Sequence, residues 1–226
     1  MTHRQSGARG FVRVAYDDRM RRYFKRHVFA LLLVLAGLGL APAYLHAYKI
    51  GGASAVPTVL VGDKILVNCA AYSLKAPYSS ATLFRTGSPR RGDLVFLRLP
   101  NEPRLRGFFK RIIGLPGETV ELRENRVLID GRAMPVKALN PADFAWVPKT
   151  HPIGTTVEYE DGHWITFTAG GSPYRNHPAT RLTAGQYFLL GDNRDNSYDS
   201  REFGPVSEDF FLGKIIAILP TAERVK

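Results

Sequence analysis

The chain has 226 residues, of which 45% are hydrophobic and 23% are charged, and this composition excludes a disordered or low-complexity protein. The net charge of +11 is typical of proteins that bind nucleic acids or membranes. Six of the net positive charges lie in residues 1–27, directly before an uncharged apolar run, so a membrane flank explains them better than a nucleic-acid site. Cys69 is the only cysteine, which excludes an internal disulfide and a cysteine-based metal site.

Residues 28–45 form the apolar run, and a helix of this length extends roughly 27 Å, just enough to cross a bilayer once. The small residues Ala41-Pro42-Ala43 also fit the exit of a cleavable signal peptide, but the basic lead and the apolar run are both longer than usual. A buried core helix is a third interpretation, which the adjacent positive charges argue against. We interpret residues 28–45 as an uncleaved transmembrane signal anchor, with the basic tail 1–27 in the cytoplasm and the rest outside.

Beyond the run, Ser54 lies in a stretch of glycine and alanine, where a substrate backbone can approach closely, and Pro57 fixes the turn that follows. A serine in such a stretch is ordinarily a loop serine. Residues 64–68 predict the next strand, residues 70–92 a polar connection, and residues 94–99 another strand.

A lysine stands inside the next apolar run. Residues 108–113 predict a strand, which residues 114–117 end with turn chemistry. Because side chains alternate along a strand, Phe108, Lys110 and Ile112 share one face. A lysine between them is poorly solvated, which lowers the pKa of its ammonium group and allows it to act as a general base near neutral pH. The alternative is a lysine with a buried stem whose ammonium reaches water.

After this strand the pattern is that of an all-β protein. Hairpins are predicted over residues 119–129 and around Asp161-Gly162. Proline and glycine are dense over residues 135–178, which indicates a loop-rich insertion on a compact β core. Residues 186–190 and 214–219 are typical of closing strands.

The loop between the closing strands, residues 191–206, is rich in Asp, Asn and Ser. It does not supply the alternating acidic ligands, glycine and glutamate of an EF-hand calcium loop. Arg194 and Arg201 would also compete with a cation for the carboxylates. We therefore expect a loop held by salt bridges and by bonds from side chains to the backbone.

Three segments now stand in a fixed order: residues 54–58 with the serine, residues 110–118 with the lysine, and residues 191–201. Together they resemble type I signal peptidase, the membrane-bound serine protease that removes signal peptides from exported proteins. The resemblance covers roughly residues 28–220. It implies a nucleophile at Ser54, a general base at Lys110, an orienting hydroxyl at Ser197, and a buried ion pair between Asp199 and Arg201.

The resemblance also implies a fold and a place in the cell. The fold is mainly β, with a single N-terminal transmembrane helix followed by an antiparallel coiled-sheet β catalytic domain over residues 46–226, in which residues 118–185 form an inserted β-rich subdomain. The implied partners are the signal peptides of exported preproteins, cut after small residues of the A-x-A type, and the lipid bilayer of a bacterial inner membrane. The catalytic domain is expected on the periplasmic or extracytoplasmic side. No cofactor, metal or nucleic acid is expected.

The substrate is expected to bind in extended form at a strand edge, over shallow pockets lined by Ile50, Gly51, Gly52 and Phe109. Two positions depart from the family pattern. Ala55 stands where the family usually has methionine, and Gly52 stands where many members have a serine whose hydroxyl helps to hold the oxyanion. The backbone N–H of Ser54 is then the main candidate for that role.

The residues themselves support the same chemistry. None of the six histidines lies in a recognisable triad motif, so a neutral lysine is the available base for a serine nucleophile. Lowering a lysine pKa from about 10.4 to about 8 disfavours its ammonium by roughly 3 kcal/mol, which burial can supply. Two alternatives stay open. A conjugation or pilus-maturation peptidase shares this chemistry, and a non-catalytic membrane-anchored β binding module would not need Ser54 and Lys110 together.

Overall fold

The chain divides into two compact units, residues 1–42 and residues 43–226. The computed structural model describes residues 23–32, 43–76, 81–99, 107–144, 156–167 and 172–221. In the first unit residues 23–32 are helical, and residues 33–42 of the predicted anchor lie outside the described residues. Within the described ranges, no helix combines the length and the apolar character that a bilayer crossing requires.

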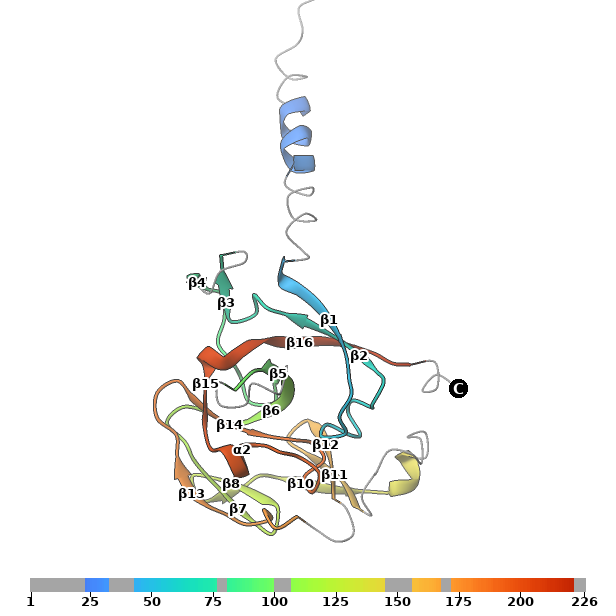
Figure 1. Cartoon of the computed structure of the whole chain (residues 1–226), viewed down its shortest axis with the longest axis vertical. Helices are drawn as coiled ribbons and strands as arrows, with labels where there is room; N and C mark the ends of the chain where they lie inside the picture. Colours follow the sequence, from blue (N-terminus) through green and yellow to red (C-terminus); the bar gives the residue numbers. More distant parts are fainter. Residues whose placement is uncertain are drawn as a thin grey trace, which may run out of the picture. The chain divides into compact units, whose positions relative to one another are not determined.

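The second unit is built around a seven-stranded sheet (Figure 1). From one edge to the other, its strands are β1 (Leu45–Lys49), β2 (Lys64–Asn68), β16 (Phe211–Leu219), β5 (Leu94–Leu97), β6 (Phe108–Gly114), β14 (Gln186–Leu190) and β15 (Val206–Ser207). Every neighbouring pair in this sheet is antiparallel. The last strand, β16, lies between β2 and β5, so segments from both ends of the unit become neighbours in space.

Three smaller sheets complete the described part of the unit. The four-stranded sheet contains β13 (His177–Arg181), β7 (Thr119–Arg123), β8 (Arg126–Ile129) and β9 (Arg132–Ala133). The three-stranded sheet contains β10 (Val136–Leu139), β11 (Thr156–Glu160) and β12 (His163–Phe167), and the two-stranded sheet is the hairpin of β3 (Ser73–Lys75) and β4 (Thr82–Arg85). One α-helical turn, α2 (Ser200–Phe203), and two 3₁₀ turns, Pro141–Phe144 and Glu208–Phe210, lie between strands.

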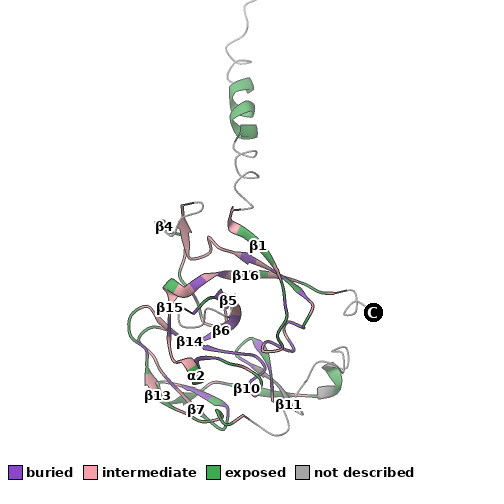
Figure 2. Cartoon of the chain, viewed as in Figure 1, coloured by how far each residue is buried: buried purple, intermediate pink, exposed green. Residues whose placement is uncertain are grey.

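The burial of the strands follows from their neighbours. In β2 the side chains alternate, with Ile65 and Val67 fully buried and Lys64 exposed, as expected for a strand with one face on the core. In β6, by contrast, every residue from Phe109 to Gly114 is buried (Figure 2). Two cations, Lys110 and Arg111, are therefore carried into the interior by β6. Each needs a partner or a shifted pKa, because burying an isolated charge is costly.

The prediction of a mainly β, antiparallel fold is confirmed. The strand expected at residues 64–68 is β2, and the hairpin expected at residues 119–129 is formed by β7 and β8. The prediction that residues 70–92 form only a connection was wrong, because they contain the hairpin of β3 and β4. All four residues of β4 are exposed, so its sequence lacks the apolar alternation that marks a half-buried strand. Leu45, the last residue of the predicted anchor, is the first residue of β1.

Candidate active site

Ser54 lies in a turn between β1 and β2. The turn is fixed from below by Val56 and Val59, whose side chains are fully buried. The loop that follows β14 fixes it from the side, because the backbone N–H of Asn193 donates to the carbonyl oxygen of Ser54 at 3.0 Å. The side-chain amide of Asn193 also donates to the carbonyl oxygen of Ala53 at 3.2 Å. The main chain of Ser54 is thus held by a segment far away in the sequence.

Lys110 lies on β6 and approaches the same turn. Its Nζ is 2.8 Å from Ser54 Oγ and 3.2 Å from the carbonyl oxygen of Phe109. The residue is only 3% exposed, and its Nζ lies 5.2 Å from the centre of the Phe108 ring. The structure therefore brings the serine and the lysine that the sequence singled out into direct hydrogen-bond contact.

The surroundings of Lys110 determine its protonation. Burial lowers the pKa of Lys110 to about 8, although the carboxylates of Asp199 and Asp192 act in the opposite direction. Desolvation dominates because neither carboxylate forms an ion pair with the ammonium, each being paired with an arginine instead. A substantial fraction of Lys110 is then neutral in mildly alkaline solution, and only the neutral amine can accept a proton from Ser54.

An ion pair that the sequence did not predict connects the strand of Lys110 with the turn of Ser54. Arg111 donates to Asp192 through Nε and Nη2, at 2.8 and 2.7 Å. Thr58, in the turn of Ser54, donates its hydroxyl to the same carboxylate at 2.6 Å. Burial opposes ionisation of Asp192, but the charge and hydrogen bonds of Arg111 outweigh it and hold the pKa of this carboxyl below its usual value. The position of Arg111 next to Lys110 was the available signal.

Asp199 and Arg201 form a buried pair, with Nε of Arg201 2.8 Å from Oδ1 of Asp199. Asp199 also accepts a hydrogen bond from the backbone N–H of Gly191 at 3.0 Å, and it caps the helical turn α2. Burial opposes ionisation of Asp199, yet the bonds and charge of Arg201 keep the pKa of this carboxyl below its ordinary value. The pair thus fixes the loop between β14 and α2, which includes Ser197.

Ser197 lies close to Gly191 and to Asp199, and its hydroxyl helps to lower the pKa of the Asp199 carboxyl. Its Oγ is buried and forms no hydrogen bond of good geometry with the residues that the structure describes. The contact with Lys110 that the resemblance implies is therefore not formed in this arrangement.

Behind the loop lies a third buried pair that no sequence pattern indicated. Arg194 and Glu160 are both fully shielded from solvent and form an ion pair. His163 lies 3.8 Å from Glu160 and 4.0 Å from Asp192, and burial lowers the pKa of its ring to about 3. His163 is therefore neutral, which agrees with its place among two arginines. Within the described ranges, no three His, Cys, Asp or Glu side chains are arranged to hold a metal ion.

The four residues expected to bind substrate divide into two kinds. Ile50 and Phe109 are 5% and 6% exposed and belong to one hydrophobic cluster of the core. Gly51 and Gly52 are exposed, and a Cβ added to either would meet no atom within 4 Å. The two glycines therefore leave open space close to Ser54, whereas Ile50 and Phe109 are part of the buried core.

Comparison with known proteins identifies the family. The family model described as signal peptidase, peptidase S26, matches residues 20–219. A signal peptidase I of Pseudomonas aeruginosa is 36% identical over 209 residues, which cover 84% of this chain and 68% of that protein. Signal peptidase IB of Staphylococcus aureus is 27% identical over 189 residues, covering 83% of this chain and 81% of the relative.

A crystal structure of a signal peptidase I from Enterococcus faecalis is 31% identical, covers 57% of this chain and 97% of its own, and superposes with a TM-score of 0.36. The family match spans Ser54, Lys110 and the loop from Gly191 to Arg201, which the fold gathers into one site. The chain therefore belongs to the signal peptidase family, peptidase S26.

Proposed function

We propose that this member of the S26 family, a serine endopeptidase that cleaves signal peptides from preproteins, works through a dyad of Ser54 and Lys110. The observation that carries the assignment is the 2.8 Å contact between Ser54 Oγ and a lysine nitrogen that is 3% exposed. A buried neutral amine next to a hydroxyl is the arrangement that lysine-based activation of a serine requires.

In the proposed reaction, neutral Lys110 accepts the Ser54 hydroxyl proton while Oγ attacks the scissile carbonyl carbon. The tetrahedral intermediate collapses to an ester on Ser54, and the ammonium of Lys110 returns the proton to the leaving amine. A water molecule then attacks the ester while Lys110 takes its proton, and the bond between the acyl carbon and Oγ breaks as Lys110 returns that proton to Ser54 Oγ. The new carboxyl group leaves as the product. Asp199 and Arg201 act as positioning residues, because they hold the loop that carries Ser197.

The oxyanion requires donors that point to the site where the negative charge develops. The backbone N–H of Ser54 is the main donor in this proposal, because Gly52 brings no hydroxyl. The open space beside Gly51 and Gly52 receives the small side chains of an A-x-A cleavage site. The substrate lies there as an extended strand, and Ile50 and Phe109 support this region from the hydrophobic core.

The placement at the membrane follows from the sequence. The apolar segment that begins at residue 28 crosses the bacterial inner membrane once and ends before β1, residues 1–27 stay in the cytoplasm, and residues 46–226 form the extracytoplasmic catalytic domain with residues 118–185 as its inserted subdomain. Strands β7 to β13 all lie within that insertion, which supports its boundaries. Extraction of membranes with alkaline carbonate tests the anchor: the full chain is expected in the pellet, and a chain lacking residues 1–45 in the supernatant.

The decisive experiment measures cleavage of a purified preprotein in nonionic detergent by the full chain, by Ser54→Ala and by Lys110→Ala. Both variants are expected to lose at least a thousandfold in kcat/KM, whereas Lys64→Ala, an exposed strand lysine, is expected to retain full activity. The masses of the products give the cleavage site, which we expect after a small residue.

Each alternative has its own signature in this experiment. A non-catalytic binding module would show no cleavage by the wild type. A pilus-maturation peptidase would reject general preproteins and accept only its own precursor. Cleavage that persists in Lys110→Ala at the rate of the wild type, with Ser54→Ala inactive, would remove the lysine from the mechanism and point to another base.

A further inference from the structure

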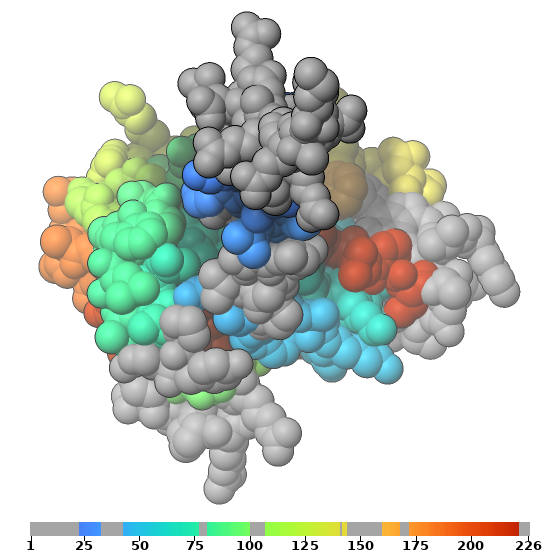
Figure 3. Space-filling view, turned by 90° about the horizontal axis from the view of Figure 1, so that it is seen from above, coloured from blue at the N-terminus to red at the C-terminus, as the bar shows by residue number. Residues whose placement is uncertain are grey.

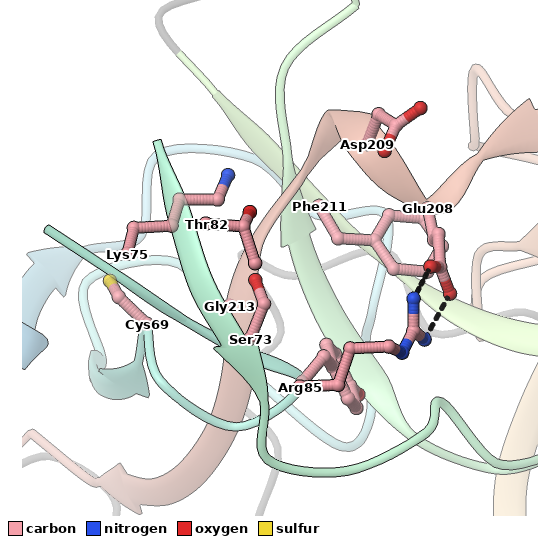
Figure 4. A pocket seen from close by; sticks show the side chains of 10 residues that line it. Cys69, Ser73, Lys75, Thr82, Arg85, Glu208, Asp209, Phe211 and Gly213 are labelled. Atoms are coloured by element: carbon pink, nitrogen blue, oxygen red, sulfur yellow. Dashed lines mark hydrogen bonds and ion pairs between the residues drawn. The ribbon is translucent and has the colours of Figure 1, made fainter. Parts of the chain in front are cut away.

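A pocket of about 300 Å³ lies between the β3–β4 hairpin and β16 (Figure 4). Neither Ser54 nor Lys110 lines it. Its floor contains the aromatic rings of Tyr72 and Phe211, which lie 6.2 Å apart. The pocket is thus a separate feature of the second unit, and the peptidase reaction makes no use of it.

One side of this pocket gathers hydrogen-bond donors. The ammonium of Lys75 and the hydroxyls of Ser73 and Thr82 lie on the same side, as Figure 4 shows. Among the residues that the structure describes, Lys75 forms no ion pair and the two hydroxyls have no hydrogen-bond partner. A cation flanked by two hydroxyls can donate hydrogen bonds to several oxygens at once. A phosphate group, which carries several negatively charged oxygens, is bound in this way.

The opposite wall limits the charge of the ligand. It carries the carboxylates of Glu208 and Asp209, and Glu208 forms a two-bond ion pair with Arg85. Asp209 accepts a hydrogen bond from Ser207 and forms no ion pair within the described ranges, although its charge helps to raise the pKa of Arg85. Its negative charge repels a doubly charged phosphate monoester more strongly than a singly charged phosphodiester. The pocket therefore favours a diester.

The residues around the pocket are those expected of a lipid-binding site. The Tyr44 hydroxyl donates to the carbonyl oxygen of Lys75 at 2.7 Å, and the backbone N–H of Cys69, which lines the pocket, donates to the carbonyl oxygen of Tyr44 at 2.8 Å. Under the proposed function, the membrane anchor ends just before Tyr44 in the chain, so these contacts belong to the first part of the second unit that follows the bilayer. Beside it on β4, Leu83 and Phe84 are 58% and 57% exposed. Figure 3 shows the β3–β4 hairpin, in green, at the surface.

We propose that this pocket binds the phosphodiester headgroup of a membrane glycerophospholipid, with its acyl chains beside Leu83 and Phe84. The lipid would fix the height and orientation of the catalytic unit at the bilayer surface. The location at the membrane rests on the proposed function, whereas the chemistry of the pocket does not.

The experiment uses Cys69, the only cysteine of the chain and a lining residue, as a reporter. The full chain in nonionic detergent is alkylated with iodoacetamide while dihexanoylphosphatidylglycerol, a soluble short-chain lipid, is titrated in, and intact mass gives the rate. We expect the lipid to slow the alkylation in a saturable way. Lys75→Ala should need roughly tenfold more lipid for the same protection, because a charge-assisted bond is lost. The alkylation rate of each variant is compared with the rate of the same variant without lipid. This is necessary because burial raises the pKa of the Cys69 thiol and the charge of Lys75 lowers it.

Two ligands and one variant serve as controls. Glycerol 3-phosphate tests a free phosphate, and dihexanoylglycerol tests the tails alone; both should protect at least tenfold less well. Lys49→Ala removes an exposed lysine of β1 outside the pocket and should protect like the wild type. Equal protection by dihexanoylglycerol, equal protection of Lys75→Ala, or tighter binding of glycerol 3-phosphate would each overturn the proposal. Ser54→Ala should lose cleavage and keep the lipid effect, so failure of the proposed function is seen separately.

Discussion

Arg111 and Asp192 form a two-bond ion pair inside the protein, with the arginine on β6 and the aspartate in the loop after β14. Arg111 follows Lys110 directly, and Asp192 also accepts the hydroxyl of Thr58 from the turn of Ser54. A single carboxylate thus ties the strand of the proposed base to the turn of the proposed nucleophile. We expect the distance between Ser54 Oγ and Lys110 Nζ to depend on this connection.

Replacing Asp192 with asparagine tests the connection. Arg111 would be left buried without a counter-charge, so we expect the free energy of unfolding to fall by on the order of 3 kcal/mol. Because the Asp192 carboxylate raises the pKa of Lys110, its loss should shift the alkaline midpoint of activity to lower pH, with kcat/KM at least roughly tenfold lower. Denaturant unfolding and a pH–rate profile measure both effects. In Glu121→Gln, which removes a surface partner of Arg123, neither should change; a midpoint of Asp192→Asn at or above that of the wild type would contradict the assigned role.

The pH dependence of the wild type follows from Lys110. Its ammonium form cannot accept the proton of Ser54, and its pKa is lowered to about 8 by burial. The value of kcat/KM is therefore expected to rise with pH and to level off above a midpoint near 8. A profile measured from about pH 6 to pH 10 with an uncharged peptide substrate checks this. A midpoint near 6.5 would instead point to a histidine as the base.

The same lysine should make the protein less stable than it could be. Its folded pKa of about 8 lies below the ordinary 10.5, so the unfolded chain binds more protons between these values and stability rises with pH there. At pH 7 the fold still contains a buried ammonium. We expect Lys110→Met to raise the free energy of unfolding at pH 7 by roughly 3 kcal/mol, with a gain that disappears toward pH 10.5.

Denaturant unfolding at pH 7 and at pH 10 compares Lys110→Met with the wild type. Lys49→Met, at an exposed position of β1, provides the matched control and should change little at either pH. A gain of the same size at both pH values would mean that the added stability comes from packing and not from removing the charge.

Gly52 offers a gain of activity. A Cβ at this position meets nothing within 4 Å, so a serine fits without displacing its neighbours. Its hydroxyl could add a second donor to the oxyanion site, and loss of one such donor typically costs on the order of a hundredfold in kcat. Gly52→Ser should therefore raise kcat by roughly tenfold or more, measured with saturating preprotein. Gly51→Ser is equally uncrowded and should give no gain, so an increase in both variants would exclude a specific donor.

Gly191 is required for close approach. A Cβ on it would lie 2.6 Å from the carbonyl oxygen of Ser54 and would overlap the side chain of Ser197. Gly191→Ala should push the loop away from the turn of Ser54. We expect the melting temperature to fall and kcat/KM to fall by at least tenfold. Gly51→Ala, in open space, is the comparison. Full activity of Gly191→Ala would show that the loop position does not control the site.

The sequence alone was sufficient to indicate the serine-peptidase family and most of the strands. Ser54 in a small-residue stretch, Lys110 between Phe108 and Ile112, and the loop from residue 191 are each local patterns. The strand alternation of β2 and the hairpin of β7 and β8 are also local, because each depends on residues a few positions apart. The hairpin of β3 and β4 was not predicted because β4 is exposed along its whole length, so its residues show no apolar alternation.

Tertiary structure decided which residues meet. Three contacts depend on segments that are far apart in the sequence. Asp192 bonds both Arg111 and Thr58, Asn193 donates to the carbonyl oxygen of Ser54, and Arg194 pairs with Glu160. The pKa of Lys110 likewise needs the whole shell that excludes water, because desolvation is a property of every atom packed around the amine. The sequence identifies the groups that can react. The distances between these groups and their burial are determined only when the strands pack together in the folded protein.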